Sequence, residues 1–166
     1  MELELNFADS LSKEERYERF IPLFASLIKG ERNEIGVLAN TTAVLHQAFR
    51  FFWTGFYLVA DDQWLKLGPF QGRVACWSIR KGRGVCGTAW EERRTQVVPD
   101  VDKFPGHIAC SSLSRSEIVV PLIDASGRVH GVLDIDSDRL GTFDETDRIW
   151  LERVCGIISH ELYADE

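Results

Sequence analysis

The spacing of apolar residues changes twice along the chain, and this change limits the possible folds more than any other feature. Apolar residues recur every three or four positions through the N-terminal third, a spacing typical of two amphipathic helices. From Trp53 the chain becomes a series of short aromatic and β-branched runs separated by turn residues, which predicts strands. Helical spacing returns after Thr142. Helices on both sides of a group of strands favour an α+β fold, with the helices packed on one face of a sheet.

Sequence signals mark where the helices begin and end. Ser12 with Glu15 forms a capping-box pattern, and Gly30 ends the helix that follows. A second helix is predicted after Gly30, and Thr142 with Glu145 forms another capping-box pattern ahead of the last helix. The apolar stripe of the second helix is expected to face the core. It consists of Ile35, Leu38, Thr42, Leu45, Phe49 and Phe52.

Six short runs are predicted to form the strands. They are Trp53–Ala60, Trp64–Leu67, Val74–Ile79, Gln96–Val98, Glu117–Ile123 and Arg128–Asp136. The glycines of KGRGVCG end the third strand before a short helix over Thr88–Arg93. Asp124–Gly127 joins the last two strands as a hairpin. Residues 100–116 form a long loop, and loops of that length in a compact domain are usually functional.

Composition narrows the class of partner and the compartment. The chain has 19 basic and 26 acidic residues and no run of Lys or Arg, which argues against a nucleic-acid surface. No apolar stretch approaches the roughly 20 residues that span a bilayer, and the start, MELELNFADS, does not resemble a secretory signal. No repeat or low-complexity linker divides residues 1–166. We therefore expect a single domain in the reducing cytoplasm that binds neither nucleic acid nor membrane.

The four cysteines are the main candidates for chemistry, because cysteines in a reducing compartment are more often free, catalytic or metal-bound than structural disulfides. Cys155 follows the apolar spacing of the last helix and is expected in the core. Cys76 lies in a predicted strand, which by itself also favours the core. Cys86 opens a short helix, whose N-terminus stabilises a thiolate and gives this residue some reactivity. Cys110 lies in the long loop, where packing gives no reason for a cysteine.

Zinc fits these cysteines poorly. Structural zinc sites usually pair their ligands as Cys-x₂₋₄-Cys, whereas Cys76 and Cys86 are ten positions apart and only His107 and Cys110 have a short spacing. Redox chemistry explains the set better. A thiolate that removes an oxygen atom becomes a sulfenic acid, a second cysteine captures it as a disulfide, and an external dithiol restores both thiols. We therefore expect thiol redox chemistry without a bound metal.

Three runs of the sequence resemble one family, the GAF-domain reductases of free methionine-(R)-sulfoxide. The runs are LGPFQGRVACWSIRKGRGVCGTAW, VVPDVDKFPGHIACSSLSRSEIVVPL and GVLDIDS. The similarity includes WTGFYLV and covers roughly residues 33–155. The resemblance implies a GAF-like fold, with a six-stranded antiparallel sheet and the N- and C-terminal helices packed on one face. It also implies an enzyme that uses thiols to reduce free methionine-(R)-sulfoxide to methionine, a reaction that counters oxidative stress.

The resemblance implies roles for three of the cysteines. Cys110 in GHIAC matches the family's nucleophile, which attacks the sulfoxide sulfur and becomes a sulfenic acid. Cys76 in RVAC matches the resolving cysteine, and Cys86 in GVCG a supporting or alternative one. The resulting redox-active disulfide is recycled by an external protein dithiol of the thioredoxin type. No bound cofactor is therefore expected.

Five further residues match the family's substrate pocket. Trp53 and Tyr57 in WTGFY match residues that line the pocket for the substrate's methyl end. Glu117, Asp134 and Asp136 match the acidic residues that hold the polar end. An aromatic wall suits a methyl group, and carboxylates suit an ammonium group. Clustered carboxyl groups also raise one another's pKa, so one of the three holds the proton that the departing sulfoxide oxygen needs.

These pocket residues also have simpler structural interpretations. Trp53 and Tyr57 face the same way on one strand and are equally expected in the core. Asp134 and Asp136 share a strand face and are also compatible with two solvated aspartates at the end of a strand. The sequence leaves both interpretations open.

An acidic pocket conflicts with a reactive thiolate, because nearby carboxylates raise the pKa of Cys110. Either His107 or Arg115 supplies a compensating charge, or substrate binding activates the thiol. Two other functions also stay open, a non-catalytic GAF sensor of a small molecule and a peroxide-responsive Cys76–Cys110 switch. The cysteine set and the lack of an attached output domain favour the enzyme. If the chain assembles, a two-fold homodimer is the commonest arrangement to expect.

Overall fold

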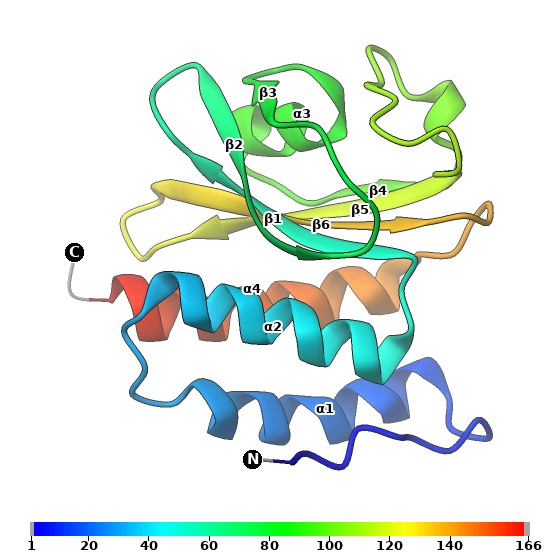
Figure 1. Ribbon diagram of the computed structural model, residues 1–166, viewed down its shortest axis with the longest axis vertical. Coiled ribbons are helices and arrows are strands. Elements are labelled where there is room, and N and C mark those ends of the chain that lie inside the picture. The colour runs from blue at the N-terminus through cyan, green and yellow to red at the C-terminus, as the bar shows by residue number, and fades with distance from the viewer. Residues whose placement is uncertain (1, 165–166) are drawn as a thin grey trace.

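Six strands form one antiparallel sheet in the computed structural model, which describes residues 2–164 (Figure 1). Across that part of the chain the strand order is β3-β2-β1-β6-β5-β4. The strands are β1 (Trp53–Val59), β2 (Trp64–Gln71), β3 (Ser78–Arg80), β4 (Gln96–Val98), β5 (Ser116–Ile123) and β6 (Val129–Ser137). β1 and β6 therefore occupy the centre of the sheet, with β2 and β5 beside them.

The helices lie on both sides of this sheet. α2 (Glu34–Phe49) and α4 (Glu145–Tyr163) pack on one face, and α1 (Lys13–Ile28) packs on those two helices as an outer layer (Figure 1). α3 (Gly84–Glu92) covers the opposite face together with the long loops. The predicted α+β class, with the terminal helices on one face of a six-stranded antiparallel sheet, is confirmed. No helix in the described residues is long and apolar enough to span a membrane.

Side chains of the central strands alternate between the two faces, and each face buries its own apolar cluster. The cluster under α2 and α4 includes Phe56, Ile118, Val120, Leu133 and Ile135. The cluster under α3 includes Trp53, Tyr57, Val119 and Val132. Because both faces are covered, a charged side chain on a central strand has no solvated side to occupy.

The third predicted strand is wrong over most of its length. β2 continues past Leu67 to Gln71, and only Ser78–Arg80 pairs with it as β3. Gly72 has a φ of +134°, which residues with a side chain rarely adopt, and it turns the chain out of the sheet. Residues 73–77 are irregular. Cys76 therefore lies in a connecting segment and is half-buried, rather than in a strand of the core.

The predicted stripe of the second helix is wrong at both of its ends. Arg50 adopts a left-handed conformation with a φ of 55° and caps α2, so Phe52 lies beyond the helix. Ile35, in the first turn of α2, is 69% exposed instead of facing the core. The middle of the stripe is buried as predicted, at Leu38, Thr42 and Leu45. Helical spacing thus located the helix, but the turns at its ends set which residues are covered.

The start of α1 is confirmed, whereas the start of α4 was predicted two residues too early. Ser12 and Glu15 form the expected capping box, with hydrogen bonds of 3.0 and 3.1 Å. The N-cap of α4 is Asp144, which forms its capping box with Asp147. The Thr142 hydroxyl instead forms hydrogen bonds within the preceding turn. A carboxylate that caps two amides takes the place of the predicted threonine cap.

Asp147 also joins α4 to the outer helix. Its carboxylate accepts hydrogen bonds from the Tyr17 hydroxyl at 2.6 Å and from the Lys13 ammonium at 2.6 Å. It accepts a third from the Asp144 amide at 2.9 Å. Asp147 is 2% exposed and Tyr17 is fully buried, so no water replaces these partners. One buried acceptor therefore both starts α4 and anchors α1.

The variant Asp147→Ala is expected to lower the free energy of unfolding by about 2–4 kcal/mol, because the buried Tyr17 hydroxyl loses its acceptor and Lys13 loses the shortest of its contacts. Glu145→Ala removes only the exposed partner of Arg148 on the same helix and is expected to cost at most about 0.5 kcal/mol. Urea unfolding at neutral pH measures both variants. Equal losses would contradict the anchoring role of Asp147.

Candidate active site

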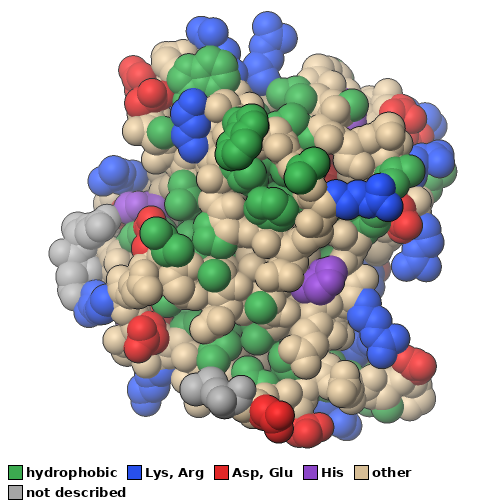
Figure 2. Space-filling view, viewed as in Figure 1, with side chains coloured by type: hydrophobic (Ala, Val, Ile, Leu, Met, Phe, Trp, Pro, Cys, Tyr) green, Lys and Arg blue, Asp and Glu red, His purple; other side chains and the backbone are tan. Residues whose placement is uncertain are grey.

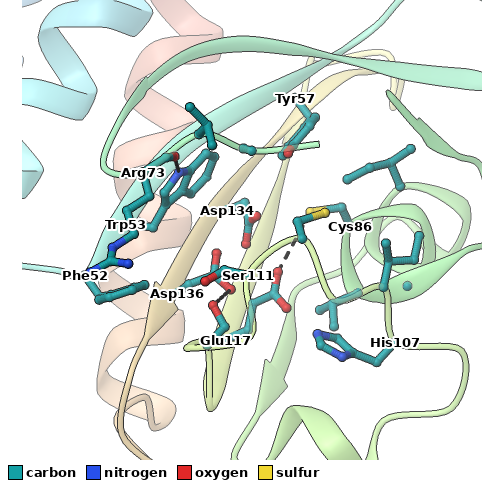
Figure 3. A pocket seen from close by; sticks show the side chains of 18 of the residues that line it. Phe52, Trp53, Tyr57, Arg73, Cys86, His107, Ser111, Glu117, Asp134 and Asp136 are labelled. Carbon is teal, nitrogen blue, oxygen red and sulfur yellow. Dashed lines mark hydrogen bonds between the residues drawn. The ribbon is translucent and has the colours of Figure 1, made fainter. Parts of the chain in front are cut away.

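Three carboxyl groups lie side by side on the α3 face of the sheet. Asp134 and Asp136 are two residues apart on β6, so their side chains share this face. Glu117 on β5 pairs directly with Asp136, and Gly55 on β1 pairs with Asp134. Figure 3 shows the three carboxyl groups converging. Because Asp134 and Glu117 are each 6% exposed, the interpretation of Asp134 as a solvated strand-end residue is wrong.

Trp53 and Tyr57 form an aromatic wall on the β1 side of these carboxyl groups (Figure 3). Their ring centroids are 6.1 Å apart, and the Trp53 ring also stacks on Phe70. Gly55 lies between them on the same face, and any side chain there would collide with the Trp53 indole. Both rings are buried in the core and also line a cavity, so the two interpretations of these residues are compatible.

The polar atoms of the aromatic wall hold the segment that carries Cys76. The Trp53 indole N–H donates to the Arg73 carbonyl at 2.9 Å. The Tyr57 hydroxyl donates to the Cys76 carbonyl at 3.1 Å. Residues 73–76 thus gain from two side chains the hydrogen bonds that a strand would have given them. The wall therefore fixes the position of Cys76 as well as one side of the cavity.

Cys76 and Cys110 form a disulfide, with their Cα atoms 5.4 Å apart, inside the usual range for such a bond. It joins the segment after β2 to the long loop before β5, two parts of the chain 34 residues apart. Cys110 is exposed and Cys76 half-buried, so the bond is open to reagents in solution. Cys86 and Cys155 are free and buried, and the predicted core position of Cys155 is confirmed.

Cys86 lies at the start of α3, which begins at Gly84 rather than at the predicted Thr88. Its thiol is within 4.0 Å of a carboxyl oxygen of Glu117 (Figure 3). Burial raises the pKa of the Cys86 thiol well above its usual range, and negative charge on Asp134, Glu117 and Asp136 raises it further. These two effects outweigh the lowering of the Cys86 pKa that the helix N-terminus was expected to cause. The environment of Cys86 therefore favours the neutral thiol over the thiolate.

The pKa of each of the three carboxyl groups is raised above its ordinary value, chiefly by burial. Burial raises the pKa of Glu117 and of Asp136 well above normal, and repulsion from Asp134 raises both further. Burial raises the pKa of Asp134 as well, whereas hydrogen bonds from its neighbours and positive charge on His107 lower it. The Ser114 hydroxyl donates to Asp136 at 3.1 Å. Burial therefore favours the protonated form of Glu117 and Asp136, whereas at Asp134 this effect is partly offset.

A cavity between these groups brings the predicted site residues together. Every one of them lines it except Cys76, which the disulfide joins to Cys110 on the cavity wall. In this disulfide form the cavity measures about 50 Å³, enough for only a few water molecules.

Most of the basic residues that line this cavity were not predicted from the sequence. Arg73 and Arg83 line the cavity, as does His107, whereas Arg115 does not. A signal for them exists, because residues 73–83 contain four basic residues and no acidic one in a chain of net charge −7. The hydrogen bond from Ser114 to Asp136 had no comparable signal in the sequence.

Comparison with known proteins places the chain in a family. The family model described as the GAF domain matches residues 31–162. GAF domain-containing protein A of Dictyostelium discoideum is 56% identical over 149 residues, which cover 90% of this chain and 94% of that protein. The free methionine-R-sulfoxide reductase of Saccharomyces cerevisiae is 41% identical over 162 residues, which cover 93% of this chain and 90% of that enzyme. The chain belongs to the free methionine-R-sulfoxide reductase family.

A solved structure of this reductase family matches the fold closely. The free methionine-R-sulfoxide reductase from Neisseria meningitidis, solved in complex with its substrate, is 49% identical to this chain with a TM-score of 0.88. The match covers 93% of each chain. The resemblance and the GAF-like fold predicted from the sequence are therefore confirmed. The roles of individual residues stay predictions.

Three residues of the site also form a set of donors suited to a metal ion. Ligand atoms of Cys86, Glu117 and Asp134 all lie within 4.8 Å of one another, and all three residues are buried. A metal requires a deprotonated thiolate and deprotonated carboxylates. The pKa of each of these three groups is raised, chiefly by burial. At neutral pH the arrangement favours bound protons over a metal ion, and a site without metal stays a prediction.

The variant Glu117→Gln is expected to weaken the pH dependence of stability. A carboxyl group whose pKa is raised on folding stabilises the fold fully below its unfolded pKa, about 4, and loses that contribution as the pH rises through the folded pKa. The wild-type free energy of unfolding should therefore fall as the pH rises above about 4. In Glu117→Gln it should fall less, and urea unfolding of the disulfide form over this range measures the difference.

Glu18→Gln, at an exposed position on α1, is the matched control and should follow the wild-type curve. Parallel curves for wild type and Glu117→Gln would show that Glu117 ionises normally and would contradict the buried protonated cluster.

Proposed function

We propose that this chain reduces free methionine-(R)-sulfoxide to methionine, with Cys110 as the nucleophile and Cys76 as the resolving cysteine. The observation that carries the proposal is the Cys76–Cys110 disulfide beside a cavity that contains an aromatic wall and three carboxyl groups. A disulfide in that position is the oxidised end point expected of a thiol reaction inside the cavity. Membership of the reductase family supports the same reaction.

The reaction begins when the Cys110 thiolate attacks the sulfoxide sulfur and a carboxylic acid protonates the sulfoxide oxygen. The oxygen then passes from the substrate sulfur to the Cys110 sulfur as the bond between the two sulfur atoms breaks, so methionine leaves and Cys110 becomes a sulfenic acid. The Cys76 thiol then attacks the Cys110 sulfur, the S–O bond breaks, and the oxygen leaves as water. The sulfoxide and two thiols thus become a thioether, a disulfide and water.

In this proposal Asp134 is the ionised carboxylate, and Glu117 and Asp136 are the acids. Burial raises the pKa of Asp134, but hydrogen bonds from its neighbours oppose that rise, so the charged form is favoured at Asp134 over Glu117 and Asp136. An ionised Asp134 suits the ammonium group of the substrate, whereas the protonated Glu117 and Asp136 supply the proton for the oxygen. Trp53 and Tyr57 receive the methyl end, which suits an apolar aromatic surface.

The same protons remove the conflict between an acidic pocket and a reactive thiolate. A fully ionised cluster would disfavour the Cys110 thiolate, but protonated Glu117 and Asp136 reduce the negative charge that it meets. We place the compensating positive charge on His107 and Arg83, which line the cavity together with Cys110. The acid cluster therefore serves both the oxygen and the thiolate.

A protein dithiol of the thioredoxin type is the reductant in this proposal, and no bound cofactor takes part. Its two thiols restore Cys76 and Cys110 by exchange, and the partner leaves as a disulfide. A reducing cytoplasm supplies such proteins and keeps the buried Cys86 and Cys155 as thiols. A homodimer stays a prediction, and light scattering tests it by measuring the molecular mass in solution.

A coupled assay tests the substrate. The chain is mixed with thioredoxin, thioredoxin reductase and NADPH, and NADPH oxidation is followed with the free R epimer, the free S epimer or peptide-bound methionine sulfoxide. Turnover is expected with the free R epimer alone, because buried carboxyl groups recognise a free amino group that a peptide lacks. No turnover of any of the three would overturn the proposal. Oxidation by peroxide without sulfoxide turnover would instead favour a thiol switch.

Cysteine variants test the assigned roles. In single-turnover reactions of prereduced protein, Cys110→Ser is expected to release no methionine, because the nucleophile is absent. Cys76→Ser is expected to release about one equivalent and then stop, because its sulfenic acid lacks the resolving thiol. Cys155→Ser, which changes a buried cysteine outside the cavity, is the control and should turn over repeatedly. Equal yields from the Cys110 and Cys76 variants would contradict the assignment, and continued turnover of Cys76→Ser would make Cys86 the resolving cysteine.

A further inference from the structure

Exposed apolar side chains gather around the disulfide. Seven large hydrophobic residues are exposed in the described part of the chain, and four of them lie within three positions of Cys76 or Cys110. These four are Val74, Trp77, Ile108 and Leu113, which are 89%, 81%, 38% and 43% exposed. Isolated exposed apolar residues are ordinary, but a group on two loops joined by a redox-active bond indicates a contact surface.

Trp77 is the most unusual member of this group. It follows Cys76 directly, yet it does not line the substrate cavity. Its carbonyl accepts a hydrogen bond from the Leu67 amide at 3.0 Å, and β3 begins at the next residue. The backbone therefore presents the indole from a fixed position. A rigid exposed tryptophan is the residue type most enriched at the energetic centre of protein interfaces.

Basic residues border the apolar group. Arg73, Arg80, Lys81 and Arg83 are all exposed, and residues 73–83 contain no acidic residue although the whole chain carries a net charge of −7. The Arg80 guanidinium lies over the Trp64 ring at 5.8 Å, and the Lys81 ammonium lies over the Trp90 ring at 4.9 Å. Aromatic rings thus hold two of these charges on the segment that follows Cys76. The local charge suits a partner with an acidic border.

We propose that Val74, Trp77, Ile108 and Leu113 form a docking surface for a thioredoxin-type protein dithiol, with Trp77 as the central contact; this rests on the proposed function. A small thiol needs no such surface, whereas a protein must hold its dithiol in line with the S–S bond. Its first thiolate attacks one sulfur, the Cys76–Cys110 bond breaks, and a mixed disulfide forms. Its second thiolate then displaces the enzyme sulfur, and the two enzyme cysteines take up the protons that the partner's thiols release.

The space-filling view shows exposed hydrophobic side chains on this face of the molecule. Figure 2 shows several hydrophobic side chains exposed near one another in the upper half of this face, over the end of the molecule that carries β2, β3 and α3 in Figure 1. Lys and Arg side chains border this region. Because Val74 and Ile108 also line the cavity mouth, a docked protein would cover the cavity. Methionine must therefore leave before the reductant binds.

The variant Trp77→Ala tests the surface. With saturating sulfoxide, kcat/KM for thioredoxin is expected to fall at least about tenfold, the loss typical of a central interface residue. Turnover driven by dithiothreitol should be unchanged, because the small reductant needs no docking. Ile35→Ala removes another largely exposed apolar side chain, from α2, and should change neither rate. An unchanged thioredoxin rate, or an equal loss with both reductants, would overturn the proposal.

Charge reversal provides a second test. Lys81→Glu is expected to lower the thioredoxin rate and reduce its dependence on ionic strength, whereas Lys29→Glu at the end of α1 should leave both unchanged. Equal effects of the two reversals would show that net charge alone acts and would count against the surface.

Reduction without substrate separates this proposal from the proposed function. Reduced thioredoxin is mixed with the oxidised chain, and release of the Cys76–Cys110 disulfide is followed by stopped flow. Failure of sulfoxide turnover with dithiothreitol would overturn the function while leaving this measurement intact. Equal reduction of wild type and Trp77→Ala would overturn the docking surface alone. A lower molecular mass of Trp77→Ala by light scattering would also overturn it, since the surface would then join two copies of the chain.

Discussion

Pairing Glu117 with Asp136 across β5 and β6, with Asp134 beside them, puts three carboxyl groups into one largely buried patch. Both faces of the central strands are covered, so these groups have no solvated side to turn to. Burial and mutual repulsion both favour the neutral acid, and the patch keeps protons that an exposed patch would lose. The neutral thiol of Cys86 and the proton for the sulfoxide oxygen both follow from this one constraint.

The segment from Arg73 to Arg83 connects this chemistry to the outside. The indole of Trp53 and the hydroxyl of Tyr57 hold its start by hydrogen bonds, so the residues proposed to receive the substrate also position Cys76. The same segment then presents an exposed tryptophan and several basic side chains to solvent. Disulfide formation and the proposed docking of a reductant therefore share one short stretch of backbone, and two residues of the proposed substrate pocket hold it in place. A substitution that moves this segment should therefore affect each of these steps.

Sequence patterns predicted the helices, the sheet and the shared face of Asp134 and Asp136, because these depend on local spacing. These patterns failed where a contact between distant residues, or a single backbone angle, determines where a helix or strand begins or ends. The N-cap of α4 is Asp144 instead of the predicted Thr142, because Asp147 completes the capping box while it also binds partners on α1. Cys76 lies outside its predicted strand because Gly72 turns the chain there, and hydrophobic spacing does not predict such a turn. The arginines at the cavity carried a charge signal, but only the fold shows which of them reach it.

The central claim is that the acid cluster holds protons at neutral pH, and a carbon-13 NMR titration of the side-chain carboxyl groups tests it most directly. Glu117 and Asp136, assigned by comparison with Glu117→Gln and Asp136→Asn, are expected to keep the chemical shift of a protonated acid at neutral pH. Their pKa should lie well above the ordinary carboxyl value of about 4. Titration of both groups near that ordinary value would contradict the account, since the site would then hold no proton for the sulfoxide oxygen.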